Sequence, residues 1–266
     1  MGAVSLSVLL LGYPISRSLS PAMQNAAFEA LHIDCRYLVR QVGRDDLAAA
    51  IADLRGDAQT LGANVTIPHK ESVVALLDEL DPLARRIGAV NTISRHSEKL
   101  KGWNTDVDGF RRALAEASSS PIAGEDRGGG YRRVAIIGAG GAARAVAAAL
   151  QTVAAQVWVI ARNLDQARRL CHDLNIERGR PVGIDEMQAT VERAELVVNA
   201  TPVDLPPASW VRPDQRLFDL RSRRSAEGRA MLLHQGAASF QIWTGQTAPL
   251  AVMRAALDGA AEGVPA

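Results

Sequence analysis

The sequence predicts an α/β protein made of two domains, and three observations lead to that prediction. Strand-like and helix-like segments alternate through the first third of the chain, and a second alternating series begins after a low-propensity stretch at 118–131. A glycine-rich turn follows the first strand of that second series. Alternating strand and helix patterns predict mainly parallel sheets covered by helices. The chain of 266 residues is long enough for two domains of ordinary size.

In the first domain, short apolar runs predict strands and longer periodic segments predict helices. Strands are expected at Val4–Leu11, Cys35–Val42 and Ala63–Ile67, and helices at Pro21–Leu31, Asp45–Leu54 and Glu71–Leu77. Proline is tolerated at the start of a helix because no N–H is needed there, and Ser20 is expected to be the N-cap of the helix that Pro21 begins. A hairpin is expected from Ala89–Ser94 and Leu100–Trp103 around a polar turn.

In the second domain, the same patterns continue after the Ser- and Gly-rich connection. Strands are expected at Val134–Ile137, Val157–Ile160, Leu196–Val198 and Leu217–Asp219, and helices at Ala142–Val153 and Leu164–Leu174. The tail is helical by period at Gly228–Trp243 and Ala248–Ala260, and we expect it to return to the first domain. The predicted domains are therefore 1–107 plus 228–266 for substrate binding and catalysis, and 108–227 for binding a dinucleotide in a Rossmann-type fold.

Composition excludes several classes of protein. Hydrophobic residues make up 47% and charged residues 22%, as in a soluble globular protein, and the net charge of +1 gives no electrostatic footprint for nucleic acid. No apolar run reaches the length of a membrane span, and the apolar start lacks the basic region of a signal peptide. Two distant cysteines indicate a reducing compartment, and we expect a cytoplasmic protein. The cysteine and histidine spacing does not favour a metal site.

The glycine-rich turn carries a dinucleotide signature. It reads Gly138-Ala139-Gly140-Gly141-Ala142-Ala143 directly after an apolar strand. Gly138 permits a tight turn, Gly140 lets the backbone approach a pyrophosphate, and the helix start at Gly141 and Ala142 supplies unpaired N–H donors. The alternative is a glycine-rich turn that binds nothing.

The end of the next strand indicates which dinucleotide is bound. An NAD site places an acidic residue about 20 residues after the turn to hold the ribose hydroxyls. This chain instead has Ala161-Arg162-Asn163, with no acid before Asp165. Arg162 could pair with a 2′-phosphate through charge-assisted hydrogen bonds, or it could be a solvated loop residue. We favour NADP.

Lys70 is a candidate for proton transfer. Only three of the 30 basic residues are lysines, and Lys70 follows a short apolar strand on which Asn64 and Thr66 alternate onto one face. The pKa of an amine can be tuned for proton transfer, whereas a guanidinium stays charged. A structural lysine is the alternative at this point.

Seven collinear motifs resemble those of the shikimate dehydrogenase family across nearly the whole chain. They are Gly12–Pro21, Gly62–Lys70, Gly88–Thr92, Gly102–Asp106, Gly138–Ala143, Asn199–Pro202 and Met231–Ala237. The resemblance implies a dehydrogenase that interconverts 3-dehydroshikimate and shikimate with NADP. Such an enzyme has a small-molecule substrate and neither a nucleic-acid nor a membrane partner, and we expect a monomer or homodimer.

The resemblance also implies roles for individual residues. Lys70 and Asp106 would form the catalytic pair at the reacting hydroxyl, which fits the need for a group that takes a proton as hydride leaves. The substrate's carboxylate and hydroxyls would be held by Ser18, Ser20, Thr66, Asn91 and Gln235. NADP would be held by the glycine turn together with Arg162, Asn163 and Thr201.

Several positions depart from the family pattern. Arg17 stands where the family usually has His, Gln166 stands where NADP-using members often carry an arginine, and Ala230 replaces a glycine. After Phe218-Asp219-Leu220 the family has a tyrosine-containing motif, whereas this chain has Arg221–Arg224. The family then has a further segment before its C-terminal substrate helix, and here only the four residues 225–228 stand between Arg224 and Arg229. These arginines would either replace the tyrosine as carboxylate ligands or face water, and we favour the solvated interpretation.

Three alternatives follow from these departures and from the two-domain plan. The chain could be a divergent paralogue acting on quinate or an amino-shikimate, or a non-catalytic NADP or ligand sensor of the same fold. Retention of both Lys70 and Asp106 argues against the sensor. A folate-linked methylene dehydrogenase is disfavoured because it needs a Tyr-x-x-x-Lys pairing, and none of the three tyrosines is followed by lysine four places later.

Overall fold

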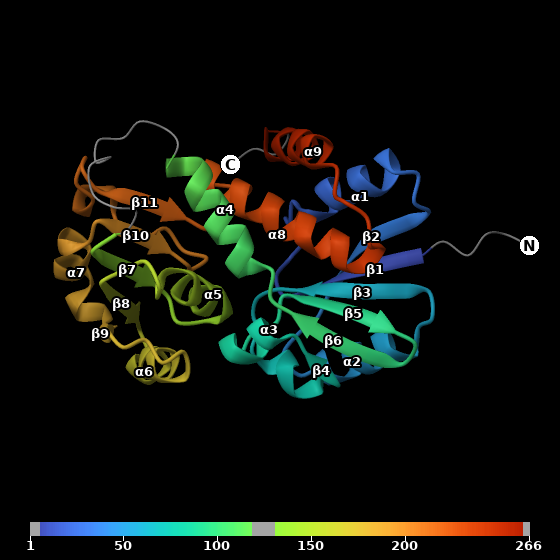
Figure 1. Ribbon diagram of the computed structural model, residues 1–266, viewed down its shortest axis with the longest axis horizontal. Helices are drawn as coiled ribbons and strands as arrows, with labels where there is room; N and C mark the ends of the chain where they lie inside the picture. Colours follow the sequence, from blue (N-terminus) through green and yellow to red (C-terminus); the bar gives the residue numbers. More distant parts are fainter. Residues whose placement is uncertain (1–5, 119–130, 263–266) are drawn as a thin grey trace, which may run out of the picture. The chain divides into compact units, whose positions relative to one another are not determined.

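The computed structural model describes residues 6–118 and 131–262 (Figure 1). Contacts between residues divide the chain into two compact units, Met1–Thr105 with Leu232–Ala266, and Asp106–Met231. Each unit contains its own sheet, so the predicted α/β class with two sheets is confirmed. The predicted connection at 118–131 lies almost entirely outside the described residues.

The first unit contains a mixed sheet of six strands in the order β2-β1-β3-β5-β6-β4. The strands are β1 (Leu6–Gly12), β2 (Cys35–Gln41), β3 (Thr60–Val65), β4 (Glu79–Leu80), β5 (Thr92–His96) and β6 (Lys99–Trp103). β1 runs parallel to β2 and β3, whereas β5 runs antiparallel to both β3 and β6. The expected hairpin is thus confirmed as β5 and β6, and it makes the sheet mixed.

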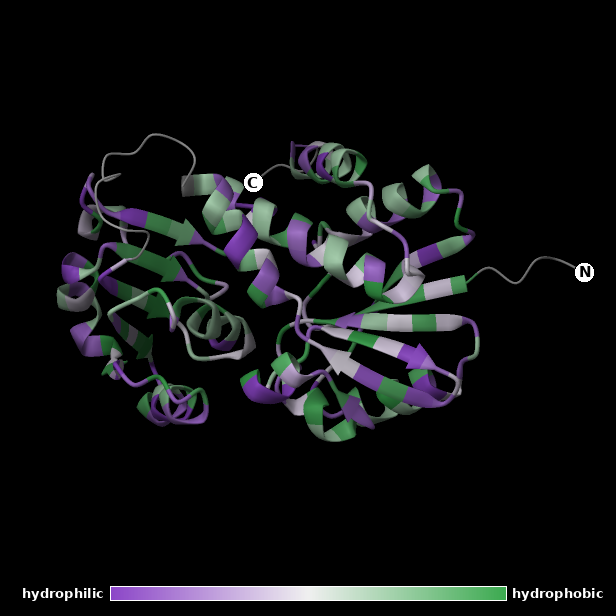
Figure 2. Cartoon of the chain, in the orientation of Figure 1, coloured by the Kyte–Doolittle hydropathy of each residue, from purple (hydrophilic) through white to green (hydrophobic). Residues whose placement is uncertain are grey.

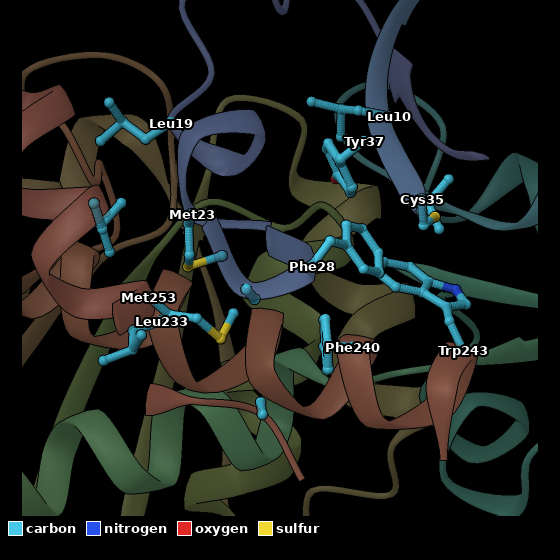
Figure 3. Packing of buried hydrophobic residues seen from close by; sticks show 14 of the residues in the cluster. Leu10, Leu19, Met23, Phe28, Cys35, Tyr37, Leu233, Phe240, Trp243 and Met253 are labelled. Carbon is cyan, nitrogen blue, oxygen red and sulfur yellow. The ribbon is translucent and has the colours of Figure 1, made fainter. Parts of the chain in front are cut away.

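Helices cover both faces of this sheet. They are α1 (Ser20–Ala30), α2 (Leu47–Gly56), the 3-10 helix η1 (Ser72–Leu76), α3 (Pro82–Ile87), α9 (Leu250–Glu262) and the part of α8 (Ala226–Thr244) that follows Met231. Side chains alternate along β1, so Val8 and Leu10 join the core with α1, α8 and α9, while Leu9 and Leu11 join the core with α2. Figure 3 shows the first of these cores, in which Phe28 and Phe240 are in ring contact.

Three expected elements differ from the structure. The segment Glu71–Leu77 forms only the short η1, and the strand expected to reach Ile67 ends at Val65. The helix α1 begins at Ser20 with Leu19 as its N-cap, and among the described residues no side chain caps that position. Ser20 was therefore wrongly predicted as the N-cap. Ser20 is instead the first residue of α1, and its N–H donates to the Ser18 hydroxyl at 3.2 Å.

The close approach of α8 to α1 depends on Gly236. A Cβ atom at Gly236 would lie 2.3 Å from the Met23 side chain, so no larger residue fits without displacement. The Gln24 side chain of α1 also donates to the Gly236 carbonyl at 3.0 Å. These contacts fix the position of Gln235, the preceding residue of α8.

The second unit contains a parallel sheet of five strands in the order β11-β10-β7-β8-β9. The strands are β7 (Arg133–Ile137), β8 (Gln156–Ala161), β9 (Gly179–Gly183), β10 (Leu196–Asn199) and β11 (Arg216–Asp219). The helical segments are α4 (Asp106–Ser118), α5 (Gly141–Leu150), α6 (Leu164–Asp173), η2 (Ile184–Glu186), α7 (Met187–Arg193) and η3 (Ala208–Trp210). The central strands β7, β8 and β10 are mostly hydrophobic in Figure 2, as expected for parallel strands buried on both faces. The sequence analysis missed α4, β9 and α7.

Two contacts tie helices into this second unit. Phe110 of α4 lies in ring contact with Phe218 of β11, with centroids 4.9 Å apart. The guanidinium of Arg144 on α5 is buried and pairs with Asp173 of α6 at 2.9 Å. Among the described helices, none is both long enough and apolar enough to cross a membrane.

Gly62 is a position where the first unit does not tolerate a side chain. A Cβ atom there would lie 2.0 Å from the Ile93 carbonyl oxygen and 2.8 Å from the Trp243 indole nitrogen. We expect Gly62→Ala to lower the free energy of unfolding by about 1–3 kcal/mol or more, measured by urea denaturation.

Gly56→Ala is the matched control for this variant. Gly56 ends α2, and a Cβ atom there meets no atom within 4 Å. We expect this control to be neutral or slightly stabilising. Equal stability of the two variants would contradict the close approach of Gly62 to β5.

Candidate functional site

The predicted substrate and catalytic residues of the first unit follow or precede strand ends at one edge of its sheet. Ser18 and Ser20 follow β1, and Thr66 and Lys70 follow β3. Asn91 directly precedes β5, which runs antiparallel to β3, so it lies at the same edge as the end of β3. Loop residues at the carboxyl ends of parallel strands are a common location for ligand sites.

Asn91 is the centre of the hydrogen bonding at this edge. Its carbonyl accepts from the Val65 N–H at 2.8 Å, and its own N–H donates to the Trp103 carbonyl at 3.1 Å. Its side-chain oxygen accepts from the Thr105 N–H at 2.8 Å. Asn91 thereby fixes the ends of β3 and β6 relative to each other.

Gln235 of α8 joins the same cluster. The side-chain nitrogen of Asn91 donates to the Gln235 Oε1 at 3.1 Å and to the Thr105 hydroxyl at 2.8 Å. The Gln235 Nε2 donates to the Leu232 carbonyl at 3.0 Å. Asn91 and Gln235, which are 144 positions apart in sequence, are therefore brought together as the resemblance implied.

A second buried link joins Tyr37 to Asn91 through Asn64. The Tyr37 hydroxyl donates to the Asn64 Oδ1 at 2.8 Å, and the Asn64 Nδ2 donates to the Asn91 carbonyl at 3.0 Å. Burial raises the pKa of Tyr37 above its ordinary range.

Lys70 is half-buried and is positioned by its neighbours. The ring of the preceding residue, His69, is buried and its Nε2 donates to the Val42 carbonyl at 2.7 Å. The Lys70 carbonyl accepts from the Val90 N–H at 2.7 Å, next to Asn91. His69 therefore anchors the turn that carries Lys70.

Ser18, Thr66 and Asp106 are placed by different contacts. The Ser18 hydroxyl accepts from the Ser20 N–H at 3.2 Å, and the Thr66 N–H donates to the Leu11 carbonyl at 2.9 Å. Asp106 is buried, directly follows Thr105, and is the first residue of α4.

The glycine turn of the second unit has the geometry that a pyrophosphate requires. Gly138 follows β7 with φ +117°, a conformation that favours glycine, and a Cβ atom there would lie 3.2 Å from the Ala200 carbonyl. Gly140 is the N-cap of α5. Gly141 and Ala142 form the first turn of that helix, where backbone N–H groups have no intrahelical acceptor. A glycine turn followed by a helix N-terminus is the arrangement that binds pyrophosphate in dinucleotide sites.

The end of β8 carries the residues predicted to select NADP. Arg162 directly follows β8 and its side chain is exposed. Asn163 is the N-cap of α6, and its side-chain oxygen accepts from the Asp165 N–H at 3.0 Å. An exposed guanidinium beside a helix N-terminus suits a phosphate group.

The predicted cofactor loop after β10 is held by Asn199. The Asn199 Oδ1 accepts from the Thr201 hydroxyl at 2.7 Å and from its N–H at 3.1 Å. The Asn199 Nδ2 donates to the Val203 carbonyl at 2.9 Å. Thr201 is therefore held in place by hydrogen bonds within its own loop.

Arg221 differs from the solvated interpretation of the arginine run. Its side chain is only 17% exposed and pairs with Asp219 and with Asp204. The two carboxylates raise the pKa of Arg221, and the guanidinium lowers the pKa of Asp204. Arg221 joins the cofactor loop to the end of β11, whereas Arg224 is exposed as expected.

Comparisons with known proteins match the chain in three segments. The shikimate dehydrogenase substrate binding domain matches residues 10–93, the shikimate / quinate 5-dehydrogenase model matches residues 127–207, and the shikimate 5'-dehydrogenase C-terminal domain matches residues 228–257. The chain is 44% identical to shikimate dehydrogenase (NADP(+)) of Moorella thermoacetica, covering 97% of this chain and 96% of that protein. The chain belongs to the shikimate dehydrogenase family. The resemblance drawn from the seven motifs is thereby confirmed.

Other members of the shikimate dehydrogenase family give the same result. The protein from Methanopyrus kandleri is 41% identical over 93% of both chains. The Thermus thermophilus enzyme, solved with NADP(H) and shikimate, has a TM-score of 0.79 and 32% identity, covering 96% of this chain and 99% of that chain. Quinate dehydrogenase from Corynebacterium glutamicum, solved with NAD, has a TM-score of 0.77 and 27% identity, covering 96% of this chain and 99% of that chain.

The sequence analysis missed several buried polar residues of the cluster. Thr92, Thr105 and Ser239 share hydrogen bonds there, including one of 2.7 Å between the Thr92 and Ser239 hydroxyls. These residues could have been found as polar positions within otherwise apolar segments, such as Ser239 in α8. Tyr37 was also missed, because an aromatic residue in a strand is ordinarily a core residue.

Gly138 provides a direct test of the nucleotide turn. In Gly138→Ala the positive φ becomes strained and the new methyl group approaches the Ala200 carbonyl. We expect the affinity for NADPH to fall about tenfold or more, measured by fluorescence titration.

Gly183→Ala is the control in the same sheet. Gly183 ends β9, and a Cβ atom there meets no atom within 4 Å. We expect its affinity for NADPH to match that of the unchanged protein. Unchanged binding in both variants would exclude the Gly138 turn as the cofactor site.

Proposed function

We propose that this chain is a shikimate dehydrogenase (NADP(+)), which reduces 3-dehydroshikimate to shikimate and catalyses the reverse oxidation. The observation that carries the proposal is similarity along nearly the full length to enzymes of that name. The glycine turn after β7 and the polar cluster around Asn91 support it from the structure. The reaction class is alcohol oxidation, part of the formation of aromatic amino acids through chorismate.

The proposed catalytic pair is Lys70 and Asp106. When bound, NADPH supplies the hydride that is added to the carbonyl carbon. The Lys70 ammonium donates a proton to the carbonyl oxygen during reduction and takes it back from the hydroxyl during oxidation. Asp106 holds the ammonium and the reacting hydroxyl in position.

The substrate's carboxylate and hydroxyls are assigned to the side chains of Ser18, Ser20, Thr66, Asn91 and Gln235. In the structure Asn91 and Gln235 bond to each other, so a bound ligand exchanges these bonds for its own. A ligand whose ring lacked hydroxyls would leave these buried amides without hydrogen-bond partners, and each unpaired amide would lower the free energy of binding. This cluster therefore favours a carbocyclic acid with several hydroxyls.

NADP binding is assigned to the second unit. Gly138, Gly140, Gly141 and Ala142 face the pyrophosphate, and Arg162 with Asn163 binds the 2′-phosphate. Thr201 lines the loop at the nicotinamide end. The exposed guanidinium directly after β8 is the feature that supports NADP over NAD.

The cellular location and the assembly are also proposals. A reducing compartment, the cytoplasm, suits a chain whose two cysteines are free thiols, Cys35 being buried. Burial raises the pKa of the Cys35 thiol to about 11, which keeps it protonated and unreactive at neutral pH. A monomer and a homodimer are distinguished by light scattering of the purified protein.

Substrate assays separate the proposed function from its alternatives. Shikimate, quinate and an amino-shikimate are offered separately with NADP and with NAD, and formation of reduced cofactor is followed. Turnover of shikimate with NADP supports the proposal, and turnover of quinate alone would make the chain a quinate dehydrogenase. NADPH binding by a folded protein without any turnover would support a sensor.

The role of Lys70 is tested by Lys70→Ala. We expect kcat for shikimate oxidation to fall about 10²–10⁴-fold, because the proton acceptor is removed, while NADP affinity is unchanged. Lys99→Ala, which removes an exposed lysine of β6, is the control and should retain full activity. Full turnover by Lys70→Ala would remove Lys70 from the mechanism.

Cofactor selection is tested by Arg162→Asp. We expect the ratio of kcat/KM for NADP to that for NAD to fall about tenfold or more, because a carboxylate repels the 2′-phosphate. Arg169→Asp makes the same charge change on the exposed face of α6 and should leave the ratio unchanged. An equal ratio in both variants would refute the role of Arg162.

A further inference from the structure

The loop that follows β10 lies beside the glycine turn of the second unit. A Cβ atom at Gly138 would lie 3.2 Å from the Ala200 carbonyl oxygen and 3.3 Å from the Thr201 side chain. β7 lies between β10 and β8, so this loop and Arg162 follow strands on opposite sides of β7. A dinucleotide binds across the carboxyl ends of such strands, where the strand order reverses. Because the proposed function puts the 2′-phosphate at Arg162, the loop after β10 is assigned to the nicotinamide half.

Two sets of contacts hold this loop, one at its start and one at its end. At the start, the Asn199 Oδ1 accepts from the Thr201 N–H and hydroxyl, and its Nδ2 donates to the Val203 carbonyl at 2.9 Å. At the end, the Asp204 carboxylate accepts from the Arg221 guanidinium at 2.6 Å. The Asp204 side chain is 92% exposed, whereas that of Arg221 is 17% exposed. The end of the loop is therefore tied to a cation that the protein itself holds.

Asp219, the last residue of β11, is the residue that holds the Arg221 guanidinium. The Arg221 Nε donates to the Asp219 Oδ2 at 2.9 Å, and the Arg221 N–H donates to the Oδ1 at 3.0 Å. The same Oδ1 accepts from the Asn199 Nδ2 at 3.4 Å. β11 is the neighbour of β10 in the parallel sheet (Figure 1). Asp219 thus bonds to the residues that hold both ends of the loop.

The short segment after β11 fixes the backbone from which the Arg221 side chain extends. The Arg221 carbonyl accepts from the Arg224 N–H at 2.8 Å, and the Ser225 hydroxyl donates to the Asp219 carbonyl. The Gly228 N–H donates to the Ser225 hydroxyl at 2.8 Å. A Cβ atom at Gly228 would lie 2.8 Å from the Arg221 carbonyl carbon, so this segment packs closely against the start of α8.

We propose that Arg221 is a positioning residue for the nicotinamide half of the dinucleotide: its guanidinium bonds to Asp219 and Asp204 and so fixes the end of the loop that follows β10. The proposal rests on the proposed function, because it concerns how the cofactor is held. A guanidinium can bond to two carboxylates at once, since it carries five donors in a planar fork. A loop that is fixed before binding loses less conformational entropy when the cofactor binds.

The first variant is Asp204→Ala, which removes the loop's side of the contact and leaves the Arg221–Asp219 pair in place. We expect the Kd for NADPH, measured by fluorescence titration, to rise about three- to fivefold, as for the loss of an exposed ion pair. The Kd for adenosine 2′,5′-bisphosphate, which lacks the nicotinamide half, should stay unchanged. A general loss of stability would weaken both ligands alike, so the difference between them reports positioning.

Asp214→Ala is the matched control in the same unit. Asp214 pairs with Arg212 at 3.0 Å and is exposed, as Asp204 is, but it precedes β11 and so lies at the opposite end of that strand. This variant removes an equal charge and one ion pair far along the strand from the loop. We expect it to bind NADPH and the bisphosphate with unchanged Kd values.

Arg221 itself is tested by two substitutions. Arg221→Ala leaves the half-buried Asp219 carboxylate without its cation, so we expect a tenfold or greater rise in the Kd for NADPH, about twice the loss of Asp204→Ala in free energy. Arg221→Lys keeps the charge but not the planar fork, and it should weaken NADPH about as much as Asp204→Ala does. The lysine variant provides the test if the alanine variant does not fold.

A double-mutant cycle tests whether the two residues act through their mutual contact. Asp204→Ala should have no further effect on the Kd for NADPH in an Arg221→Lys background. Multiplicative effects of the two substitutions would overturn the proposal. So would an unchanged Kd for NADPH in Asp204→Ala, or equal weakening of NADPH and the bisphosphate.

These titrations need no turnover, which keeps them separate from the test of the proposed function. If the unchanged protein binds NADPH but does not turn over shikimate, the proposed reaction is contradicted, and the Kd values of the same variants still support or overturn the role of Arg221. If the unchanged protein does not bind NADPH, both proposals are overturned.

Discussion

The hydrogen bonds of Asn91 are the interaction on which the polar edge of the first unit depends. Its backbone joins the ends of β3 and β6, and its side chain joins Thr105 to Gln235 of α8. Without it, three segments distant in sequence would lose their common partner. The same residue thus closes the sheet edge, and under the proposed function its amide also contacts the substrate, so that folding and recognition would share one side chain.

The second unit differs, because its glycine turn presents backbone groups and no large side chains after β7. The turn at Gly138 has a positive φ, and α5 begins directly afterwards with its N–H groups unpaired. The Arg221 guanidinium, in the segment where the resemblance led us to expect a tyrosine motif, forms ion pairs with both Asp219 and Asp204. The short 221–228 segment therefore retains a defined connection between β11 and the cofactor loop.

The sequence was sufficient to predict the strands and helices that are marked by a local residue pattern. Apolar strands followed by glycine or by polar residues were predicted with their order. The resemblance placed Asn91 and Gln235 in one site, but their bond to each other was not predicted. The N-cap role of Ser20 was wrong because a serine before Pro21 has the pattern of an N-cap, whereas α1 begins one residue earlier than expected, with Leu19 as its N-cap. Arg221 was misjudged because its pairing with Asp204 depends on a loop 17 positions away. Long-range pairing of polar side chains has no local pattern.

The mutual pairing of Asn91 and Gln235 has a consequence for how this family can diversify. A substitution at either residue removes a bond from the resting protein as well as from any complex, so a change of substrate at these positions is coupled to a loss of stability. Ser18 and Thr66 lie outside that mutual pair, so substitutions there should cost less stability. New specificities should therefore arise first at the loops after β1 and β3, with the Asn91–Gln235 pair inherited unchanged.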